Sequence, residues 1–324
     1  MDQLNQQQQL QLRHEHYQLQ QEHQQLKQEN KQLQQGHQQS LDRLEYAEIR
    51  ARDAESQLHE IQSHWIIPKS EIQLTNKMLG QGAWGNVYVA RFRGTLAAAK
   101  CYHRILLSEH NVRLFHQEIS MAARLRHPNL VQFIGASIEA ELILVTELMT
   151  ISLGDLMHRG ALSEANITSI SLDVAQALNY LHLMQPHPII HRDICSGNVL
   201  LDPLPEGCWK AKVSDYGSVN LLQHLTTAHP GNPFYAAPES KDPDLQTPKM
   251  DIYSFGVLLA EMLTNELPEK KDRHRQILKI SMEQPNFVEL VRQCLCEEGD
   301  HRPSAEHIIK QLSICRSLEN FPVE

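Results

Sequence analysis

The sequence predicts an α+β protein with two lobes, in which a strand-rich lobe is followed by a helical lobe and preceded by a long coiled-coil helix. Three observations lead to this prediction. Leucines recur every seven residues in a polar N-terminal segment, short β-type runs cluster within residues 72–149, and helical patterns dominate within residues 150–318. Strands that come first and helices that come afterwards are typical of α+β folds. We therefore expect a coiled coil or partly disordered helix over residues 1–66 and a globular domain over residues 67–318.

The globular part carries local signals for single elements. Strands are predicted around the glycines at 80–85 and at residues 86–92, 96–101 and 142–146. A helix is predicted over residues 108–126, with Ser108 as its N-cap and His127-Pro128-Asn129 as its stop. Further helices are predicted over residues 164–183, 250–263, 276–282, 287–294 and 305–316.

The N-terminal segment carries the heptad pattern. Residues 1–40 are rich in Gln, and Leu12, Leu19, Leu26 and Leu33 occupy every seventh position. The same register continues toward residue 65 with apolar residues at both seam positions, which favours a coiled coil. The competing interpretation is a solvated, partly helical Gln-rich tail without a partner.

The other seam position of the N-terminal half is polar. It holds His16, His23, Asn30 and His37. Polar residues at a seam lower stability but restrict register and oligomeric state. Because imidazole titrates near pH ~6.5 and like charges repel, these histidines also raise the hypothesis that association depends on pH.

The composition argues against several classes of function. The formal net charge of −9 argues against a nucleic-acid-binding surface, whose affinity comes from Lys and Arg. The chain has no run of 18 apolar residues, so no membrane span is predicted. The N-terminus lacks the apolar core of a secretory signal, and the six cysteines form no C-x-x-C pair. We therefore expect a cytoplasmic protein with reduced thiols.

A glycine-rich run lies between two predicted strands. Residues 80–87 have the pattern G-x-G-x-x-G-x-V, in which glycines let the backbone approach phosphate oxygens closely. A dinucleotide-binding turn would need a helix directly after the glycines and an acidic residue about twenty positions on. Here residues 87–89 continue as a strand, and Lys100 stands twenty positions after Gly80. The pattern favours a phosphate-covering hairpin.

A second motif supplies the reactive groups. His191-Arg192-Asp193 is followed by Asn198, and Asp215 begins a D-Y-G run. Phosphoryl transfer needs one carboxylate at the attacking hydroxyl, and a second carboxylate with an amide to hold metal ions on the phosphates. The spacing H-R-D-x-x-x-x-N followed by D-aromatic-G supplies this set.

Residues 72–316 resemble a eukaryotic protein kinase domain, because these motifs occur in the family's order and at acceptable spacings. The resemblance implies a bilobal protein-kinase-like fold, with a β-rich N-lobe over residues 72–149 and a helical C-lobe over residues 150–318. It also implies ATP as the phosphate donor, Mg²⁺ as the cofactor and a protein as the substrate. The expected function is an ATP-dependent protein kinase in intracellular signalling.

The resemblance also assigns roles to single residues. Lys100 and Glu118 would form an ion pair, Asp193 would orient the acceptor hydroxyl, and Asn198 and Asp215 would bind Mg²⁺. The residues expected around ATP are Leu79, Gly80, Gln81, Gly82, Ala83, Trp84, Gly85, Asn86, Val87, Ala98, Lys100, Thr146, Glu147, Met149 and Leu200. Among these, the Glu147 carbonyl and the Met149 backbone would face adenine.

The segment that precedes the central C-lobe helix, called the docking segment, resembles the family's peptide-docking region. Ala237-Pro238-Glu239 ends this segment, and the resemblance implies an ion pair between Glu239 and Arg302. It further implies that Asp251 ties a central helix to the catalytic loop. These features argue against a small-molecule phosphotransferase.

Several positions depart from the family pattern. Tyr216 replaces the usual Phe, Cys195 stands where Ser/Thr kinases carry Lys, and Asn232 replaces Thr. This mixture resembles the tyrosine-kinase-like group, so Ser/Thr acceptors are favoured while Tyr stays open. Extra residues at 203–207 predict a longer surface hairpin. Cys195 is expected to be a structural thiol, with oxidation that blocks catalysis as the alternative.

Two questions stay open at this level. The alternative to an active enzyme is an inactive pseudokinase scaffold that assembles partners through the coiled coil, although the residues named above are all chemically competent. A phosphate on Thr226 or Thr227 would be able to pair with Arg192 and order the surrounding segment, whereas the alternative is that both are solvated loop residues.

Overall fold

The computed structural model describes residues 65–82, 85–103, 119–120, 122–139, 141–215, 232–242 and 245–319. The chain divides into two units, residues 1–64 and 65–324, and the fold is that of the second unit. The heptad segment lies outside the described residues. So do Ala83, Trp84, Glu118, Tyr216, Thr226 and Thr227.

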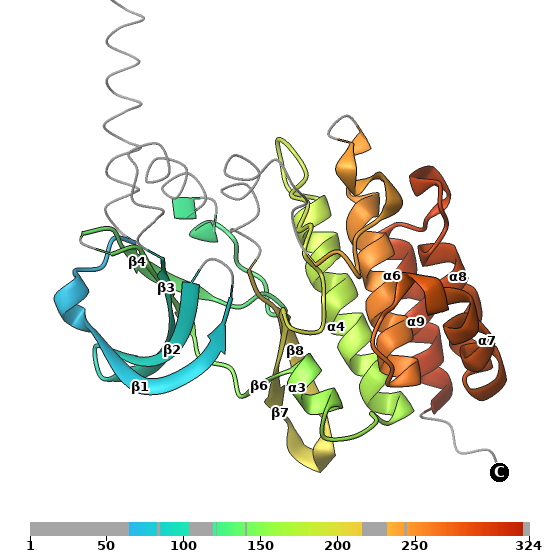
Figure 1. Cartoon of the computed structure of the whole chain (residues 1–324), viewed down its shortest axis with the longest axis horizontal. Helices are drawn as coiled ribbons and strands as arrows, with labels where there is room; N and C mark the ends of the chain where they lie inside the picture. The colour runs from blue at the N-terminus through green and yellow to red at the C-terminus, as the bar shows by residue number, and fades with distance from the viewer. Residues whose placement is uncertain are drawn as a thin grey trace, which may run out of the picture. The chain divides into compact units, whose positions relative to one another are not determined.

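A five-stranded antiparallel sheet forms the N-lobe (Figure 1), with strand order β1-β2-β3-β5-β4. The strands are β1 (Ile72–Gln81), β2 (Gly85–Phe92), β3 (Thr95–Tyr102), β4 (Phe133–Ser137) and β5 (Ile143–Glu147). A two-residue turn joins β2 to β3, and both of its residues, Arg93 and Gly94, have positive φ (49° and 85°). Such turns match the twist of the flanking strands. The β2, β3 and β5 predictions are confirmed to within one residue, whereas β4 has no counterpart in the predicted strands.

A short strap precedes β1 and pairs with β4. The Ala136 amide donates to the Trp65 carbonyl at 2.9 Å, and the Ile67 amide donates to the Ala136 carbonyl at 2.8 Å. The Trp65 ring lies edge-on to Phe133, with centroids 6.4 Å apart. A Cβ at Gly135 would lie 2.8 Å from the Trp65 carbonyl oxygen, so only glycine leaves room for the strap. Trp65, which the heptad pattern places at its last seam position, is part of the domain core.

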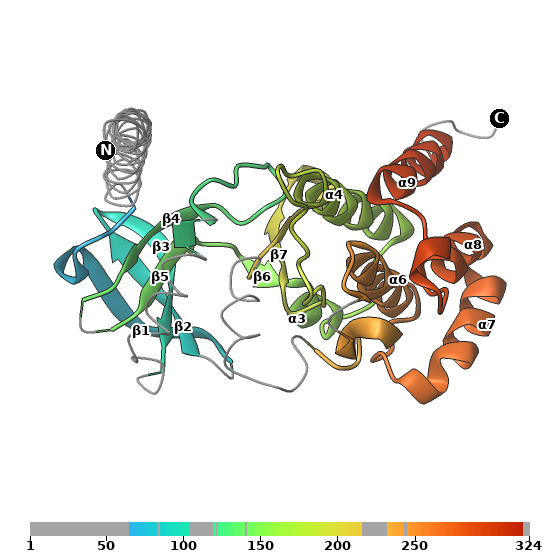
Figure 2. The same ribbon diagram turned by 90° about the horizontal axis from the view of Figure 1, so that it is seen from above.

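Helices form the C-lobe (Figures 1 and 2). They are α3 (Leu153–Met157), α4 (Glu164–His182), α6 (Lys249–Thr264), α7 (Arg273–Glu283), α8 (Pro285–Cys294) and α9 (Ala305–Glu319). The side chains of Ser152 and Ser163 accept amide hydrogens at the N-termini of α3 and α4. The sequence predicts α4 and α6 to within one residue at each end, while α7 begins three residues before its predicted start.

Helix α6 is the centre of the C-lobe. All residues from Met250 to Thr264 are buried, because α4, α7 and α8 pack around it (Figure 2). A helix that is apolar on nearly every side is expected in a core. Its buried polar residues therefore need specific partners, and several of these partners belong to the functional site.

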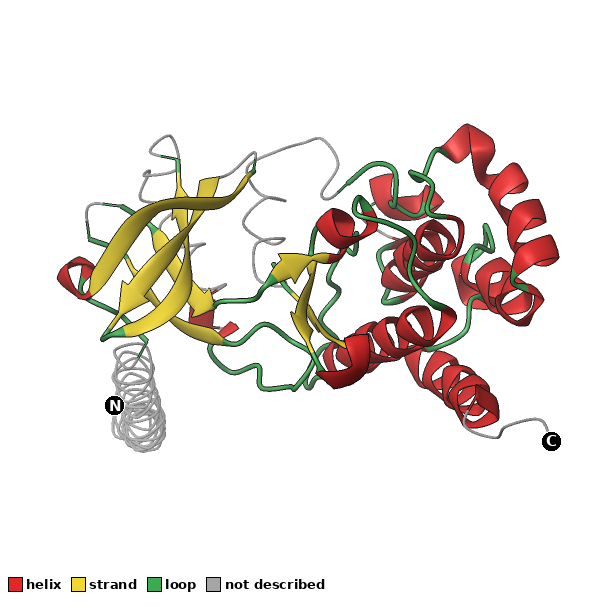
Figure 3. Ribbon diagram, turned by 90° about the horizontal axis from the view of Figure 1, so that it is seen from below, coloured by secondary structure: helices red, strands yellow, loops and turns green. Residues whose placement is uncertain are grey.

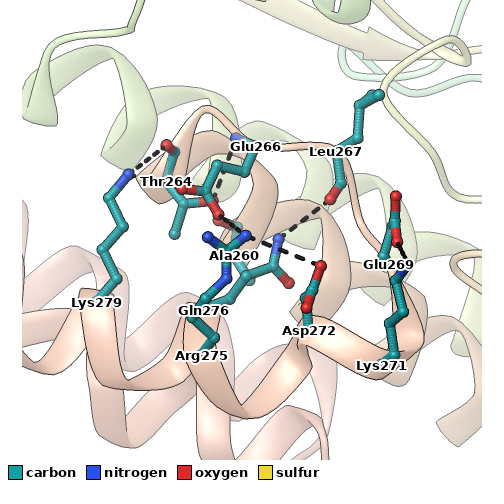
Figure 4. A network of polar contacts seen from close by, with 10 residues as sticks. All are labelled: Ala260, Thr264, Glu266, Leu267, Glu269, Lys271, Asp272, Arg275, Gln276 and Lys279. Atoms are coloured by element: carbon teal, nitrogen blue, oxygen red, sulfur yellow. Dashed lines mark hydrogen bonds and ion pairs between the residues drawn. The ribbon is translucent and has the colours of Figure 1, made fainter.

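Polar contacts fix the junction between α6 and α7 (Figure 4). Glu266 accepts hydrogen bonds from Arg275 and Lys279, both at 3.1 Å. Lys279 also donates to the Thr264 carbonyl at 3.1 Å, at the C-terminal end of α6. Gln276 donates to the Leu267 carbonyl at 3.3 Å. These bonds hold the connecting residues against α7.

A small antiparallel sheet lies beside α3 and α4 (yellow in Figure 3). It contains β6 (Ile151–Ser152), β7 (Val199–Pro203) and β8 (Trp209–Val213) in that order. The hairpin predicted around residues 203–207 is confirmed as the β7–β8 connection. The strands themselves have no counterpart in the sequence analysis, because two to five residues give little periodicity.

The turn after the predicted helix at residues 108–126 connects the lobes. The last described helical residue is Ala122, so the helix ends before the predicted Arg126. Leu125 bonds back to Ala122 in a tighter turn. The fully buried Asn129 then donates from its side chain to the Ala211 carbonyl at 3.0 Å, and its own carbonyl accepts from Val213 at 2.8 Å. Across the described residues, no helix combines the length and apolarity needed to cross a membrane.

Candidate active site

Strand β3 carries a buried lysine that meets an acidic residue from the other lobe. Lys100 Nζ lies 2.8 Å from Asp215 Oδ1. Burial lowers the pKa of Lys100, but the charges of Asp215, Tyr102 and Asp193 outweigh burial, so that its pKa lies above its usual value. Burial raises the pKa of Asp215, whereas Lys100 and His191 lower it, and the net shift is downward. The ammonium and carboxylate are therefore both charged near pH 7.

Asp193 is held from two sides. Its Oδ2 accepts a hydrogen bond from Asn198 Nδ2 at 2.8 Å, and its Oδ1 accepts from the Asn232 amide at 2.8 Å. Asn198 Nδ2 also donates to the Asp193 carbonyl at 2.8 Å. The Asn198 amide nitrogen is thus engaged within the loop, which leaves its amide oxygen as the atom able to bind a cation.

Ser214 joins Asn198 to Asp215. Its amide and hydroxyl donate to the Asn198 carbonyl at 2.8 and 2.9 Å, and its carbonyl meets His191 Nε2 at 2.8 Å. Asp215 itself has a positive φ of 60°, which is uncommon outside glycine and recurs at functional sites. The two expected metal ligands are therefore held together through a serine that the sequence analysis does not identify.

Asp251 in α6 fixes the start of the catalytic loop. Its Oδ2 accepts from the His191 amide at 2.8 Å and lies 2.8 Å from His182 Nε2, while its Oδ1 accepts from the Arg192 amide at 2.7 Å. Burial raises the pKa of Asp251, but the bonds and charges of His182, His191 and Arg192 outweigh burial, so that its pKa lies below its usual value. The link that the resemblance implies between the central helix and this loop is confirmed.

In the glycine-rich hairpin, one position requires glycine, and two other glycines have free space where a Cβ atom would lie. A Cβ at Gly85 would lie 2.3 Å from the Cys101 carbonyl oxygen, so the close approach of β3 requires glycine there. A Cβ at Gly80 would meet no atom within 4 Å, and one at Gly82 would meet only the Gly85 oxygen at 3.5 Å. The Gly82 amide donates to the Gly85 carbonyl at 2.9 Å. Space beside Gly80 and Gly82 is thus available to a ligand.

Strand register brings several expected nucleotide-binding residues together. Val87 pairs with Lys100, and Ala98 pairs with Thr146. Gln81 pairs with Asn86 across the hairpin. Ala83, Trp84 and Glu118 lie outside the described residues. Leu79 in β1, Met149 after β5 and Leu200 in β7 complete the expected set, and their contact with a base stays a prediction.

The Glu147 side chain has a structural role that the sequence does not predict. Its carboxylate accepts from the Gln132 amide at 2.6 Å and from Lys212 Nζ at 2.7 Å. Its carbonyl, expected to face adenine, accepts from the Thr146 hydroxyl at 3.2 Å. The side chain therefore fixes the connection between the lobes next to the expected base site.

The expected ion pair beneath the docking segment is confirmed. Arg302 Nη1 and Nη2 lie 2.5 and 2.9 Å from the two Glu239 oxygens. The guanidinium also donates to the carbonyls of Lys249, Cys296 and Glu297. All five N–H groups of a guanidinium are needed for this set, so lysine would not replace it.

Cys195 is a structural thiol by its surroundings. Only 8% of the residue is exposed, and chiefly burial, with the Asp193 charge, raises the pKa of the thiol to about 12. A thiol with so high a pKa supplies almost no thiolate near neutrality. This environment favours the structural interpretation over an oxidation-sensitive residue.

Comparisons with known proteins agree with this geometry. A family model described as protein kinase domain matches residues 74–313. The chain is 33% identical over 276 residues to serine/threonine-protein kinase VIK of Arabidopsis thaliana, an alignment that covers 76% of this chain and 61% of that protein. It is 32% identical over 250 residues to probable serine/threonine-protein kinase drkA of Dictyostelium discoideum, covering 72% and 38%. It is also 32% identical over 270 residues to seven transmembrane domain-containing tyrosine-protein kinase 1 of Dictyostelium discoideum, covering 75% and 38%. The chain thus spans less than two thirds of the length of each of these relatives.

Proposed function

Because the chain belongs to the protein kinase domain family, we propose that residues 67–318 form an ATP-dependent protein kinase. The enzyme transfers the γ-phosphoryl group of ATP to hydroxyl groups of protein substrates. One observation carries the proposal: Asp193 is held by Asn198 and Asn232, next to an Asp215 that is paired with Lys100 at 2.8 Å. This set supplies a carboxylate for the acceptor and charged groups for the phosphates.

The nucleotide side of the site uses the N-lobe sheet. We assign Lys100 to the ATP phosphates, with Glu118 as its helix partner, and the backbone of residues 80–85 to covering them. The open space at Gly80 and Gly82 supports this assignment. The Asp215 carboxylate and the Asn198 amide oxygen are the hard oxygen ligands that Mg²⁺ prefers. The bound metal would neutralise the charge that develops on the transferring phosphoryl group.

The chain's own contribution to the reaction is positioning and electrostatics. Asp193 accepts a hydrogen bond from the substrate hydroxyl and orients its oxygen toward the phosphorus. The Asn198 and Asn232 bonds fix the carboxylate rotamer, so little reorganisation is needed when the acceptor arrives. Lys100 holds a positive charge against the phosphates throughout the transfer. These roles need no covalent intermediate on the protein.

A pseudokinase scaffold is the second candidate, and the site geometry disfavours it. Lys100, Asp193, Asn198 and Asp215 are all chemically competent and lie within one connected set of contacts. Such a scaffold would have no need for a desolvated lysine–carboxylate pair at this point. Activity is therefore the better supported proposal.

The acceptor class rests on different observations. We favour Ser and Thr, because the Arabidopsis relative and drkA are named as serine/threonine-protein kinases and because the sequence resembles the tyrosine-kinase-like group. Incubation with Mg²⁺ and γ-labelled ATP, followed by phosphoamino-acid analysis, is expected to yield phosphoserine or phosphothreonine. Phosphotyrosine alone would overturn the acceptor class, and no label in any residue would overturn the kinase activity.

Arg192 is a candidate for binding a phosphate on the segment that follows Asp215. Its Nε and Nη1 are buried and have no hydrogen-bond partner among the described residues. Burial lowers the pKa of the guanidinium, which nevertheless stays charged. We propose that a phosphorylated Thr226 or Thr227 pairs with Arg192 and orders this segment.

We propose that residues 1–66 form a coiled coil that raises the local concentration of a second kinase domain and favours phosphorylation in trans. The heptad leucines support this coiled coil. We also propose that the protein is located in the cytoplasm. Sedimentation is expected to give a self-associated mass for the full chain and a monomer mass for a chain that starts at Trp65. If the full chain and the shortened chain both sediment as monomers, this proposal is contradicted. A mass that stays constant between pH 6 and pH 8 would contradict a pH-sensitive seam.

A further inference from the structure

An aromatic ring lies beside the lysine that is assigned to the ATP phosphates. The centroid of the Tyr102 ring is 5.6 Å from Lys100 Nζ. Both residues belong to β3, and because they are two positions apart, their side chains lie on the same face of the sheet. The face of an aromatic ring attracts a cation that lies within about 6 Å of its centroid. The ring is therefore an uncharged partner of the ammonium, in addition to Asp215.

Packing and strand pairing fix the position of this ring. Tyr102 is 7% exposed and belongs to the core cluster that also contains Ile119, Ala122 and Leu142. Its amide donates to the Leu142 carbonyl at 2.9 Å. Tyr102 also pairs with Gly85 of β2, where a Cβ atom would lie 3.0 Å from Tyr102 Cα. Tyr102 is thus anchored next to the hairpin that is assigned to cover the phosphates.

The burial of Lys100 makes this contact energetically significant. Only 11% of the Lys100 side chain is exposed, whereas the Asp215 side chain is 36% exposed. A buried ammonium needs partners that replace the water it has lost. A cation–π contact changes an equilibrium constant about 2- to 5-fold at an exposed site and on the order of 30-fold when it is removed from water. A leucine at position 102 would fill the core without supplying this interaction.

Asp215 has two cations to serve in the proposed reaction. In the structure its Oδ1 lies 2.8 Å from Lys100 Nζ, and the same carboxylate is assigned to Mg²⁺. The ammonium therefore exchanges Asp215 for phosphate oxygens when Mg·ATP binds. The aromatic face of Tyr102 is not a Mg²⁺ ligand, so it keeps its contact with Lys100 during this exchange. An ammonium that is already held in place loses less conformational freedom when the nucleotide binds.

We infer that Tyr102 is a positioning residue for the nucleotide, because the face of its ring holds the Lys100 ammonium where the ATP phosphates bind. The inference rests on the proposed function, in which Lys100 contacts these phosphates. Tyr102 acts through Lys100, and the role needs no contact between the ring and the nucleotide. Loss of the ring is therefore expected to weaken binding of ATP and to spare adenosine, which has no phosphate.

Tyr102→Leu and Tyr102→Phe test the ring by titration calorimetry on the full chain. We expect Tyr102→Leu to weaken binding of a non-hydrolysable ATP analogue with Mg²⁺ at least about fivefold. Tyr102→Phe keeps the aromatic face and should bind the analogue within about twofold of wild type. An equal loss in Tyr102→Phe would assign the effect to the hydroxyl and overturn the inference.

Adenosine affinity and KM for a peptide acceptor distinguish positioning from a general defect. Both should stay within about twofold of wild type in Tyr102→Leu, because neither ligand brings a nucleotide phosphate to Lys100. A loss of adenosine affinity as large as the loss for the ATP analogue would overturn the inference, since the whole pocket would then be disturbed.

Fluorination separates the electrostatic role of the ring from its shape. Replacing Tyr102 by ring-trifluorinated phenylalanine withdraws negative charge from the ring face while the side chain stays close in size to phenylalanine. We expect this variant to bind the ATP analogue about fivefold more weakly than Tyr102→Phe does. Affinity equal to that of Tyr102→Phe would overturn the inference, because packing alone would then account for Tyr102.

Phe92 offers the matched control for the fluorinated ring. It lies in the same sheet, and its ring centroid is 5.0 Å from the Arg93 guanidinium carbon. Arg93 pairs with Glu71 at 2.6 Å and has no role assigned at the nucleotide. The same fluorinated residue in place of Phe92 should leave affinity for the ATP analogue within about twofold of wild type. An equal loss there would overturn the role of the Tyr102 ring, because fluorination would then disturb the sheet in general.

A double-variant cycle shows whether Tyr102 acts through the lysine. In a Lys100→Met background, Tyr102→Leu should cause almost no further loss of affinity for the ATP analogue. A further loss as large as that of Tyr102→Leu alone would overturn the inference. Because binding is measured without turnover, a wild type that binds Mg·ATP but transfers no phosphate would overturn the proposed enzyme alone, and the Tyr102 variants would still decide the inference.

Discussion

Replacing Asp193 by Asn is expected to abolish phosphate transfer to a protein acceptor while leaving the thermal shift caused by Mg·ATP in place. The amide loses the negative charge that orients the acceptor hydroxyl, and a general base of this kind contributes on the order of 10²–10⁴-fold. Asn198 keeps its bond to the carbonyl of residue 193, so the expected metal ligand stays anchored. Initial rates with a peptide acceptor and a thermal-shift titration measure the two properties separately.

Asp300→Asn provides the matched control for this experiment. Asp300 is an exposed carboxylate in the short helix η7 (Gly299–His301), away from the contacts of Asp193. We expect this control to retain wild-type turnover. Turnover of Asp193→Asn that equals wild type would refute the role assigned to Asp193. A joint loss of turnover and of the Mg·ATP shift would instead indicate that the loop as a whole is displaced.

Replacing Arg302 by Met should be the most destabilising single change discussed for this domain. The Arg302 side chain is fully buried, and Glu239 is only 14% exposed. Removing one partner leaves a carboxylate and several carbonyls without their donor, which typically costs about 3–5 kcal/mol. Urea denaturation monitored by circular dichroism measures the change in the free energy of unfolding. Lys310→Met, which breaks the exposed Lys310–Glu306 pair, should leave the urea midpoint almost unchanged.

The same pair predicts how stability depends on pH. Burial raises the pKa of Glu239, but the bonds and charge of Arg302 outweigh it, so its pKa in the folded protein lies below its usual value. The pair therefore stabilises the fold fully above the unfolded-state pKa of about 4.3, and this contribution is lost as pH falls through the lower folded-state pKa. The difference in stability between wild type and Arg302→Met is expected to shrink below that pH. A difference that stays constant down to pH 3 would contradict this.

Elements with a strong local signal were predictable. Helices α4 and α6 follow from long apolar periodicity, and the β2–β3 hairpin follows from β-type runs on either side of a turn. The two-residue strand β6 gives no such signal, because its pairing with Leu200 and Leu201 defines it. Strand β4 was missed for a related reason, since its neighbour β5 and the strap at Trp65 specify its place.

The candidate site shows the same division. Reactive side chains carry their chemistry in their identity, and motif spacing located Asp193, Asn198 and Asp215. Backbone donors carry no such signature, so the Asn232 amide that bonds to Asp193 was not foreseen. Ser214 was missed because a lone serine next to an aspartate is common in any sequence. The Ser196 and Tyr235 hydroxyls that donate to the buried Glu261 on α6 were not predicted either, since three polar residues 26 to 65 positions apart indicate no contact.

By itself, the sequence determined which chemical groups are present and in what order they follow one another, because side-chain identity is a local property. That information was sufficient for an α+β domain with a phosphoryl-transfer site. Only the tertiary structure decided which groups meet. Lys100 and Asp215 are 115 positions apart and lie 2.8 Å from each other because the N-lobe sheet and the β7–β8 hairpin are brought together. Whether a buried Glu261 is satisfied depends in the same way on loops converging on α6, and no local pattern records that convergence.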